Sequence, residues 1–400
     1  MTEREFATDV VSRLQAAGFL ALFAGGCVRD ELLGLEPADF DVATSATPDQ
    51  VKAIFRRCHS FGASFGVVEV LGPRGADGEW LKVQVATFRT DGQYSDGRRP
   101  DQVAFSTPEE DAARRDFTIN GLFFDPIANE VRDYVGGRAD LEARVLRAIG
   151  DPAQRFAEDK LRLLRAVRMA ARFGLSVDPA TLTAARSMAG ELRVVSAERI
   201  ADELRKMLVH PTRGTATRLL REFGLAGIVF PEVPTEKWQD AQRSTDQLEG
   251  PVTFPLGLAA ILWNALVTSP VAERLRLSNA DADRVDWLLR VRPLAENAEN
   301  MRPSELFPIL VHPGIAELLS FLRALGQNAA ADACLRILLE VPREKLNPPP
   351  LLTGDDLKKL GHKPGPRFKR VLEEIRAAQL NGEIEDRDAA ARRAAEILAE

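Results

Sequence analysis

A chain of 400 residues is roughly two or three times the length of a typical domain, which excludes a single small module and predicts several domains. Hydrophobic residues make up 45% and charged residues 28%, which excludes wholesale disorder, collagen-like repeats and a disulfide scaffold. With 53 Lys and Arg against 59 Asp and Glu, the formal charge is −6. No chain-wide positive field exists, so any nucleic-acid site must be a local patch.

Cysteine and histidine are both rare. The three cysteines (Cys27, Cys58 and Cys334) are widely spaced and odd in number, which suits a reducing compartment better than a disulfide framework. The four histidines form no HD or HExxH pair, so metal chemistry would need carboxylates. The most apolar run, 256–267, is shorter than the roughly 20 residues that cross a bilayer. The sequence therefore predicts a cytoplasmic protein with no membrane segment.

The first 125 residues mix predicted helices and strands. The expected elements are, in chain order, a helix over 4–17, an apolar strand over 19–24 ending at Gly25-Gly26, a strand over 40–43, a helix over 49–57, and a hairpin of strands 67–71 and 80–89. From about Asp140 onward Leu, Ala and Arg recur at three-to-four spacing, which predicts helices nearly to the end of the chain. The pattern indicates an α+β head followed by an all-α remainder.

Two carboxylates lie two residues apart in the segment 38–42. If this segment is a strand, period-two alternation places Asp39 and Asp41 on one face and Phe40 on the other. Two convergent carboxylates repel each other unless a cation lies between them, and an all-oxygen site suits Mg²⁺. The second interpretation is a turn that carries two solvated acids, because this spacing is common by chance.

The glycine pair Gly25-Gly26 precedes a predicted helix that contains Arg29. A backbone without Cβ can approach a phosphate closely at a helix N-terminus, and Arg29 would add a charged fork. The alternative is an ordinary tight turn in which Arg29 pairs with Asp30. The motif is neither a GxGxxG fingerprint nor a GxxxxGK[ST] phosphate loop.

Four blocks of the sequence resemble the signature motifs of a known family. They are LFAGGCVRDELLG (22–34), ADFDVATSATP (38–48), RRDFTINGL (114–122) and RFAEDKLRLLRAVRMAARFG (155–174). In this order they are similar to the motifs of bacterial-type tRNA nucleotidyltransferases and poly(A) polymerases. The resemblance implies an α+β fold with a polymerase-β-like nucleotidyltransferase head, followed by an all-α neck, body and tail. It also implies template-independent addition of nucleotides to an RNA 3′ end.

The resemblance divides the chain and assigns roles to its residues. The predicted parts are a catalytic head (1–139), a helical neck with a nucleotide-selecting helix (140–210), a helical body (211–345) and a helical tRNA-binding tail (346–400). Asp39 and Asp41 would be catalytic and hold Mg²⁺. The implied nucleotide-binding residues are Gly25, Gly26, Arg29, Arg115, Asp116, Asn120, Asp159, Arg162, Arg165 and Arg168.

The residues Asp159, Arg162, Arg165 and Arg168 recur every three positions, so neighbours in the series would act together on one helix. The simpler interpretation is an amphipathic helix with a solvated arginine face. Cytosine and adenine, however, both carry an amino donor beside a ring-nitrogen acceptor. A carboxylate at Asp159 could accept from the amine while Arg162 donates to the ring nitrogen. Uracil and guanine present an oxygen in place of that amine, which predicts selection of C and A.

Three further segments and one residue, Gln84, help to distinguish between members of this family. The stretch 62–68 resembles tRNA nucleotidyltransferases more than poly(A) polymerases, and the loop 90–105 resembles the element used for adenosine addition. Gln84 stands where some relatives have Glu, so a further carboxylate near the metal is absent. The terminal stretch 351–375 resembles the family's tail. Its basic residues (Lys358, Lys359, Lys363, Arg367, Lys369 and Arg370) are either tRNA phosphate contacts or a solvated helix face.

These features together predict an Mg²⁺-dependent enzyme that adds C, C and A to tRNA from CTP and ATP. The alternatives are an A-adding enzyme, a poly(A) polymerase, or a catalytically idle RNA-binding helical protein. Intact Asp39, Asp41 and Arg115 disfavour the idle protein. The sequence predicts no oligomeric state.

Overall fold

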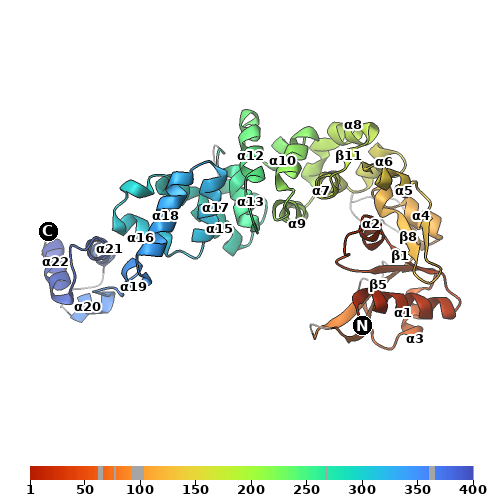
Figure 1. The fold of residues 1–400 in the computed structure, drawn as a ribbon, viewed down its shortest axis with the longest axis horizontal. Coiled ribbons are helices and arrows are strands. Elements are labelled where there is room, and N and C mark those ends of the chain that lie inside the picture. Colours follow the sequence, from red (N-terminus) through yellow and green to blue (C-terminus); the bar gives the residue numbers. More distant parts are fainter. Residues whose placement is uncertain (62–65, 76–77, 92–102, 266–268, 360–364, 400) are drawn as a thin grey trace. The chain divides into compact units, whose positions relative to one another are not determined.

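A computed structural model describes residues 1–61, 66–75, 78–91, 103–265, 269–359 and 365–399. The chain forms two compact units (Figure 1). The first comprises Met1–Leu204 and Leu219–Val229, and the second comprises Arg205–Arg218 and Phe230–Glu400. The four-part division into head, neck, body and tail stays a prediction.

A mixed seven-stranded sheet organises the first unit. Its spatial order is β3-β4-β5-β2-β1-β8-β9, and only the β2–β5 pair is parallel. The strands are β1 (Ala21–Ala24), β2 (Asp41–Thr44), β3 (Cys58–Phe61), β4 (Val67–Arg74), β5 (Trp80–Thr87), β8 (Leu122–Asp125) and β9 (Glu130–Asp133). Within the described residues, β1 is buried along its whole length, as expected of a central strand covered on both faces.

Helices α1 (Glu3–Ala16) and α3 (Pro48–Ile54) pack against the sheet and against each other. Thr2 and Thr47 cap them, each in a capping box completed three residues later by Glu5 and Gln50. Position 72 of β4 approaches the Phe6 ring so closely that a Cβ there would lie 2.7 Å from it, so a glycine is required. The predicted helix boundaries are correct to within a few residues, although α3 ends at Ile54 rather than Arg57 because Phe55 is extended.

The rest of the first unit is mainly helical, as predicted. It includes α5 (Gly137–Glu142), α6 (Pro152–Glu158), α7 (Arg162–Phe173), α8 (Pro179–Met188) and α9 (Ala197–Leu208), which continues into the second unit. Helix α7 is buried along nearly its full length and ends at Gly174, which has a left-handed conformation. Strands β3, β8 and β9 of the main sheet were not predicted, and neither was the small parallel sheet of β10 (Val145–Leu146) and β11 (Ser176–Val177). Two-residue strands are too short to leave a period in the sequence.

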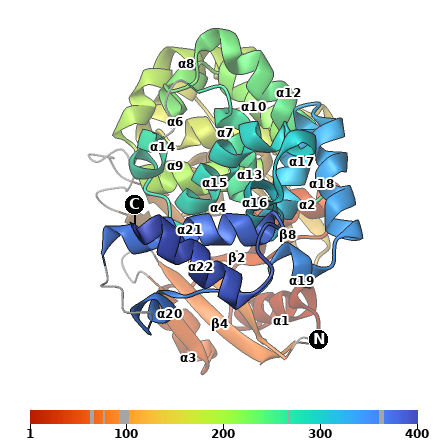
Figure 2. The same cartoon turned by 90° about the vertical axis from the view of Figure 1, so that its left-hand side faces the viewer.

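The second unit is helical in its described residues. Its main helices are α12 (Trp238–Asp246), α13 (Phe254–Leu262), α15 (Asn279–Ala295), α16 (Pro303–Leu310), α17 (Ile315–Ala324), α18 (Asn328–Glu340), α20 (Gly354–Lys359), α21 (Pro366–Leu380) and α22 (Arg387–Ala399). Figure 2 shows α21 and α22 side by side, and their apolar faces meet at Val371, Ile375 and Ala394. The α+β fold class is confirmed.

The described helices fall short of a bilayer span when each is taken singly. No single helix among the described residues is long and apolar enough. By length and composition alone, α16 and α17 pass together as a pair bent by 102°.

Candidate active site

A pocket of about 530 Å³ in the first unit brings together residues from segments far apart in the sequence. It is lined by Gly25, Gly26, Arg29, Asp39, Asp41, Arg114, Arg115, Asp116, Asn120, Asp159, Arg162, Arg165 and Met169. All the nucleotide-binding and catalytic residues predicted from the sequence line it, with the exception of Arg168. The sequence did not predict Arg114 as a site residue, although it opens the RRDFTINGL block, or Met169, which has the apolar spacing of a core residue.

The carboxylate pair lies at the start of β2. Asp41 pairs directly with Gln84 of β5, so the two side chains project from the same sheet face. Asp39 lies two residues earlier, and Phe40 between them is buried with its ring centroid 5.3 Å from that of Phe23. The strand starts at Asp41 rather than Phe40, but the alternation of charged and buried residues holds.

The surroundings of Asp41 raise the pKa of its carboxyl group. Solvent reaches this side chain, yet it lies within a concave site, and the loss of hydration raises the pKa of its carboxyl to about 6. The Asp39 carboxylate raises this pKa further, while Arg115 acts in the opposite direction. The structure therefore holds two acids close enough to disfavour simultaneous ionisation, an arrangement that a cation would relieve.

The donor groups of the pocket decide which kind of metal ion it could hold. The described part of the chain contains no group of three or more His, Cys, Asp or Glu that could hold one. Two carboxylates beside arginine side chains fit a hard divalent cation that takes its other ligands from water and phosphate oxygens. Gln84, on the same face as Asp41, can offer only a neutral amide oxygen.

The glycine turn adapts the backbone to an arginine side chain. Gly25 has a φ of 75°, a backbone conformation that residues other than glycine rarely adopt, and it precedes α2 (Gly26–Leu32). A Cβ at Gly25 would lie 2.6 Å from Nη1 of Arg115. The missing side chain thus allows Arg115 to approach the turn, and any residue larger than glycine would displace this guanidinium.

Asp111 of α4 (Pro108–Ala113) orients the two arginines of the RRDFTINGL block. Its side chain is buried, with Oδ1 accepting from Arg114 Nη2 at 2.7 Å and Oδ2 accepting from Arg115 Nη2 at 2.9 Å. Burial alone raises the pKa of the Asp111 carboxyl, but Arg115 and Arg114 outweigh it and hold this pKa below its usual range. One buried acid therefore fixes two cations at the pocket. Sequence reasoning missed Asp111, although its spacing of three and four residues from them on a helix was a usable signal.

A second buried network connects α2 to α7. Arg29 Nη1 donates to Asn120 Oδ1 at 2.5 Å, and Asn120 Nδ2 donates to Asp116 Oδ1 at 2.9 Å. Asp116 Oδ2 then accepts from Arg165 Nε at 2.8 Å. Burial acts to raise the pKa of the Asp116 carboxyl, but Arg165 and Asn120 hold it well below its usual range. Arg29 also pairs with Asp30 at 2.6 Å, so the contact expected of an ordinary turn is present as well.

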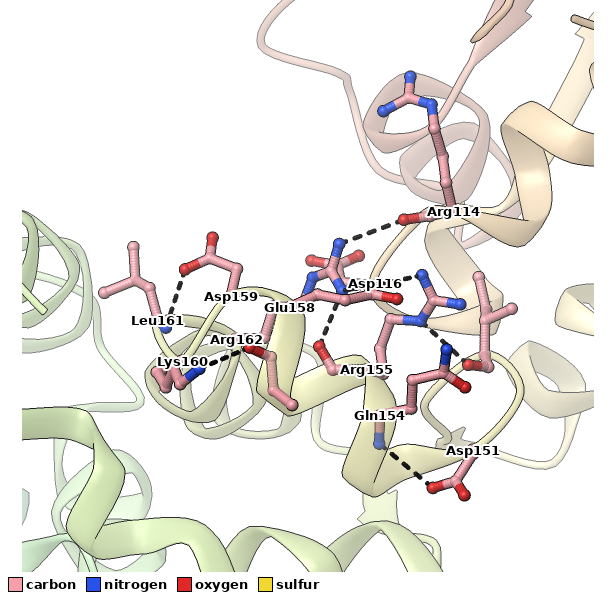
Figure 3. Close-up of polar contacts among 12 residues, drawn as sticks. Arg114, Asp116, Asp151, Gln154, Arg155, Glu158, Asp159, Lys160, Leu161 and Arg162 are labelled. Atoms are coloured by element: carbon pink, nitrogen blue, oxygen red, sulfur yellow. Dashed lines mark hydrogen bonds and ion pairs between the residues drawn. The ribbon is translucent and has the colours of Figure 1, made fainter. Parts of the chain in front are cut away.

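Asp159 does not lie on the same helix as the arginines, which corrects the prediction of one continuous helical series. It is the C-cap of α6 with an extended backbone (φ −143°, ψ 105°), and α7 begins at Arg162. Asp159 Oδ1 accepts from the backbone of Leu161 at 3.1 Å and Oδ2 accepts from Arg199 at 2.8 Å (Figure 3 shows the Leu161 bond). The break arises because the side chain of Asp159 replaces a helical backbone partner.

Arg162 is held by three oxygen acceptors. Its Nη1 donates to Glu158 Oε2 at 2.5 Å and to the carbonyl of Arg155 at 2.8 Å, and its Nη2 donates to the carbonyl of Arg114 at 3.2 Å (Figure 3). These bonds occupy three of the five N–H groups of a guanidinium. Two N–H groups remain for a ligand in the pocket.

Arg168 lies outside the pocket lining. It is buried, and its Nε donates to Glu203 Oε2 at 2.6 Å. Glu203 also faces Arg165, 4.0 Å from its Nη1, so this single buried acid lies close to two arginines of α7, of which Arg165 has Asp116 as its nearer partner. Neither Glu203 nor Arg199, the partner of Asp159, was singled out in the sequence. Both lie on α9, 40 and 35 residues after their respective partners Asp159 and Arg168, where spacing gives no signal.

Three predictions fall wholly or partly outside the described residues. The loop 90–105 is described only at its ends, where β6 (Arg89–Asp91) pairs with β7 (Val103–Phe105). Residues 62–65 of the 62–68 stretch, and Lys363 of the tail, are likewise outside the described part of the chain. Of the other basic tail residues, Lys358 pairs with Asp355 at 2.8 Å and Arg370 with Glu374 at 2.8 Å, as on a solvated helix face.

Two models of known protein families match parts of the chain. Residues 21–147 match the model of the Poly A polymerase head domain, and residues 174–236 match that of the "Probable RNA and SrmB- binding site of polymerase A". The fold and the site thus define a nucleotidyltransferase with a polymerase-type head.

Relatives that match nearly the whole chain identify the family within this class of enzymes. The CCA-adding enzyme of Pediococcus pentosaceus is 33% identical over 405 residues, covering 96% of this chain and 95% of its own length. The structure of the Bacillus stearothermophilus CCA-adding enzyme in complex with CTP matches with a TM-score of 0.80 at 28% identity, over 100% of this chain and 98% of that one. The chain belongs to the CCA-adding enzyme family.

A poly(A) polymerase is also similar to part of the chain. Poly(A) polymerase I of Haemophilus influenzae is 39% identical over 238 residues, but these cover 56% of this chain and 51% of that protein. The higher identity is therefore confined to about half of the chain, whereas the likeness to CCA-adding enzymes extends over nearly all of it.

Proposed function

We propose that this chain adds C, C and A to the 3′ end of tRNA, using CTP and ATP and releasing pyrophosphate. One observation carries the proposal: Asp159 and Arg162 line the same pocket as Asp39 and Asp41. A nucleotide in this pocket can contact both sets of groups at the same time: one pair is suited to recognising its base, and the carboxylate pair is suited to the metal ion at its phosphates. The pocket volume of about 530 Å³ lies within the range of small-molecule sites.

Base selection follows from the hydrogen-bonding capacity of Asp159 and Arg162. A carboxylate has about four acceptor positions, and Asp159 uses two of them for Leu161 and Arg199. It can therefore accept from the amino group of cytosine or adenine while Arg162 donates to the adjacent ring nitrogen. With uracil or guanine, a carbonyl oxygen would face the carboxylate and both acceptors would stay unpaired. This mismatch costs about 1–3 kcal/mol per contact.

The triphosphate would lie against the cationic side of the pocket. Two arginines line this side, Arg115 and Arg29. Asp111 holds Arg115, which lies close to Gly25, and Asn120 holds Arg29. Because buried partners fix these side chains before the substrate arrives, little ordering remains to be done on binding. Their charge also suits the pyrophosphate product, whose negative charge develops as the bond breaks.

The carboxylates Asp39 and Asp41 would hold Mg²⁺, the predicted cofactor. When bound, this ion lowers the pKa of the RNA 3′-hydroxyl and offsets charge on the departing pyrophosphate. The chain's own contribution is to fix two acids on one sheet face and to orient the nucleotide for in-line attack. No covalent enzyme intermediate is required.

Binding of the metal should depend on pH through Asp41. Its pKa of about 6 lies above the usual value of 3.8, so the folded, metal-free protein loses stability as the pH rises from about 4 to 6 and carries the full penalty above 6. A cation needs the ionised form, so it competes with the proton below pH 6. We expect Mg²⁺ to raise the melting temperature clearly at pH 7.5 and little at pH 5, as measured by differential scanning fluorimetry.

The control for this prediction is Asp41→Asn, which removes the titrating group. In this variant the Mg²⁺-induced rise in melting temperature should disappear at both pH values. An equal rise in the wild type at pH 5 and pH 7.5 would contradict the assignment of Asp41.

The proposed function is tested with two tRNA substrates, one lacking CCA and one lacking only the terminal A. CTP and ATP together should restore the complete end on the first substrate, and ATP alone should add a single A to the second. An A-adding enzyme would extend only the second substrate, and a poly(A) polymerase would add a long tract of A to both. Nucleotide binding without pyrophosphate release would indicate the catalytically idle protein.

The proposal also covers the cellular compartment and the part of the chain that contacts tRNA. We place the enzyme in the cytoplasm, because its substrates are made there and its three cysteines are all unpaired. The tail, 346–400, is proposed to contact tRNA, although its ion-paired Lys358 and Arg370 would have to exchange partners to bind phosphates.

A further inference from the structure

The sheet face that carries Asp41 continues as an exposed surface over β5 and β4. Asp41 pairs with Gln84, and along β5 the residues Trp80, Lys82 and Gln84 are exposed, while Val83 and Val85 between them are buried. The buried set faces the side on which α1 packs, since the Phe6 ring meets position 72 of β4. Asp41 and the exposed β5 side chains therefore share one face of the sheet, and over β5 this face is exposed among the described residues.

Four residues at the far end of this face form a cluster that we call the outer sheet patch: Arg57, Arg74, Trp80 and Lys82. The strand register places them together, because Arg74 pairs with Trp80, Leu71 pairs with Lys82, and the Leu71 N–H donates to the Arg57 carbonyl. The guanidinium carbons of Arg57 and Arg74 lie 5.4 and 5.2 Å from the centroid of the Trp80 ring. Trp80 itself is 42% exposed, which is unusual for so large an apolar side chain.

The outer sheet patch is positively charged within an acidic protein. In the described part of the chain, the charged groups of Arg57, Arg74 and Lys82 form no ion pair, in contrast to most arginines of the active-site pocket. Two acids are near: Glu79 precedes Trp80, and Glu69 pairs with Gln84, in the row of the sheet that also contains Asp41. At the outer end of the face, three cations thus stand against one carboxylate.

This chemistry suits the phosphate backbone of a nucleic acid. An arginine over an aromatic ring is held by cation–π attraction, and N–H groups at its edge can bind phosphate oxygens. Arg74 Nη1 already donates to the Gly78 carbonyl at 2.9 Å, so in Arg74 this role falls to the other N–H groups. Trp80 lies four residues along β5 from Gln84, a separation of about 13 Å. A stacked strand advances by about 3.4 Å per nucleotide, so this separation spans on the order of four nucleotides.

We propose that the outer sheet patch binds backbone phosphates of the RNA substrate, on the order of four nucleotides from the reacting 3′ end. The proposal rests on the proposed function, because it requires an RNA end at the carboxylate pair. RNA is favoured over an acidic protein because the patch and Asp41 share one continuous sheet face. A strand whose end reaches Asp41 can follow this face outward.

The test uses the full-length chain, a tRNA transcript lacking CCA, and fluorescence anisotropy at a series of KCl concentrations. The double variant Arg57→Gln/Arg74→Gln should bind the RNA at least tenfold more weakly. Its plot of log K against log [KCl] should be shallower by between one and two units, since about 0.7–0.9 is lost for each phosphate contact. The affinity for CTP should be unchanged, because the patch lies outside the nucleotide pocket.

Arg13→Gln is the matched control. Arg13 is another exposed arginine held over an aromatic ring, with its guanidinium carbon 4.3 Å from the Phe55 centroid, but it lies on α1. This variant should bind RNA like the wild type. Melting temperatures of all variants would show that each is folded.

The outcomes separate this proposal from the proposed function. RNA affinity and salt slope unchanged in the double variant, or lost equally in Arg13→Gln, would overturn the patch as an RNA site and leave it as a surface for another partner. A wild-type chain that adds no C or A would instead overturn the proposed function, whatever the patch binds.

Discussion

Asp41→Asn abolishes nucleotide addition and leaves the protein folded: this is the expected result with the largest effect. The substitution keeps the size of the side chain but removes one of the two negative charges that would hold the cation. We expect a loss in the rate of CMP incorporation of at least about 10³-fold, equivalent to about 4 kcal/mol of transition-state stabilisation. Asp39→Asn should act in the same way. Single-turnover incorporation of labelled CTP into tRNA measures both variants.

Stability provides the internal check on this result. Because Asp39 and burial both raise the pKa of Asp41, the metal-free Asn variant should melt at the same temperature as the wild type at pH 7.5, or at a higher one. The matched control is Asp49→Asn on α3, which neutralises an acid that is 92% exposed and lies outside the pocket. Asp49→Asn should react normally. Near-normal turnover by purified Asp41→Asn would remove the carboxylate pair from the mechanism.

Asp159→Ala should relax the choice of base, the second large effect. The alanine variant offers no acceptor for the amino group of cytosine or adenine, so UTP and GTP lose their main disadvantage. The ratio of kcat/KM for CTP to that for UTP should fall by about 5- to 150-fold, the equivalent of 1–3 kcal/mol. Incorporation of each nucleotide, offered singly to tRNA lacking CCA, gives this ratio.

Asp159 also caps the chain between α6 and α7, so its structural role has to be separated from base reading. Arg199→Gln removes the ion pair to Asp159 but keeps the carboxylate, and this variant should retain most of the selectivity. Asp159→Asn replaces an acceptor by a possible donor and should admit UTP more readily than the alanine variant does. If Arg199→Gln and Asp159→Ala relax selectivity equally, the effect arises from the backbone break rather than from the carboxylate.

The sequence made the local elements of the head predictable. Alternation about Phe40 correctly predicted which side of the chain carries the two acids, and the threonine at position 47 before a proline marked the start of α3. Such patterns depend on neighbours within a few residues, so they are visible in the sequence. The same logic failed at Asp159, where three-residue spacing suggested a continuous helix. The helix breaks there because a side chain takes the place of a backbone partner.

By itself, the sequence determined the α+β class, the order of the motifs and the identity of the residues able to do the chemistry. Only the tertiary structure decided how these residues are held. Asp111 fixes Arg114 and Arg115, and Glu203 binds Arg168 away from the pocket. The tertiary structure also showed that Arg57, Arg74 and Trp80 lie together on the sheet face that carries Asp41. Strand pairing and burial join residues that are distant in the chain, and no local period in a single sequence records such contacts.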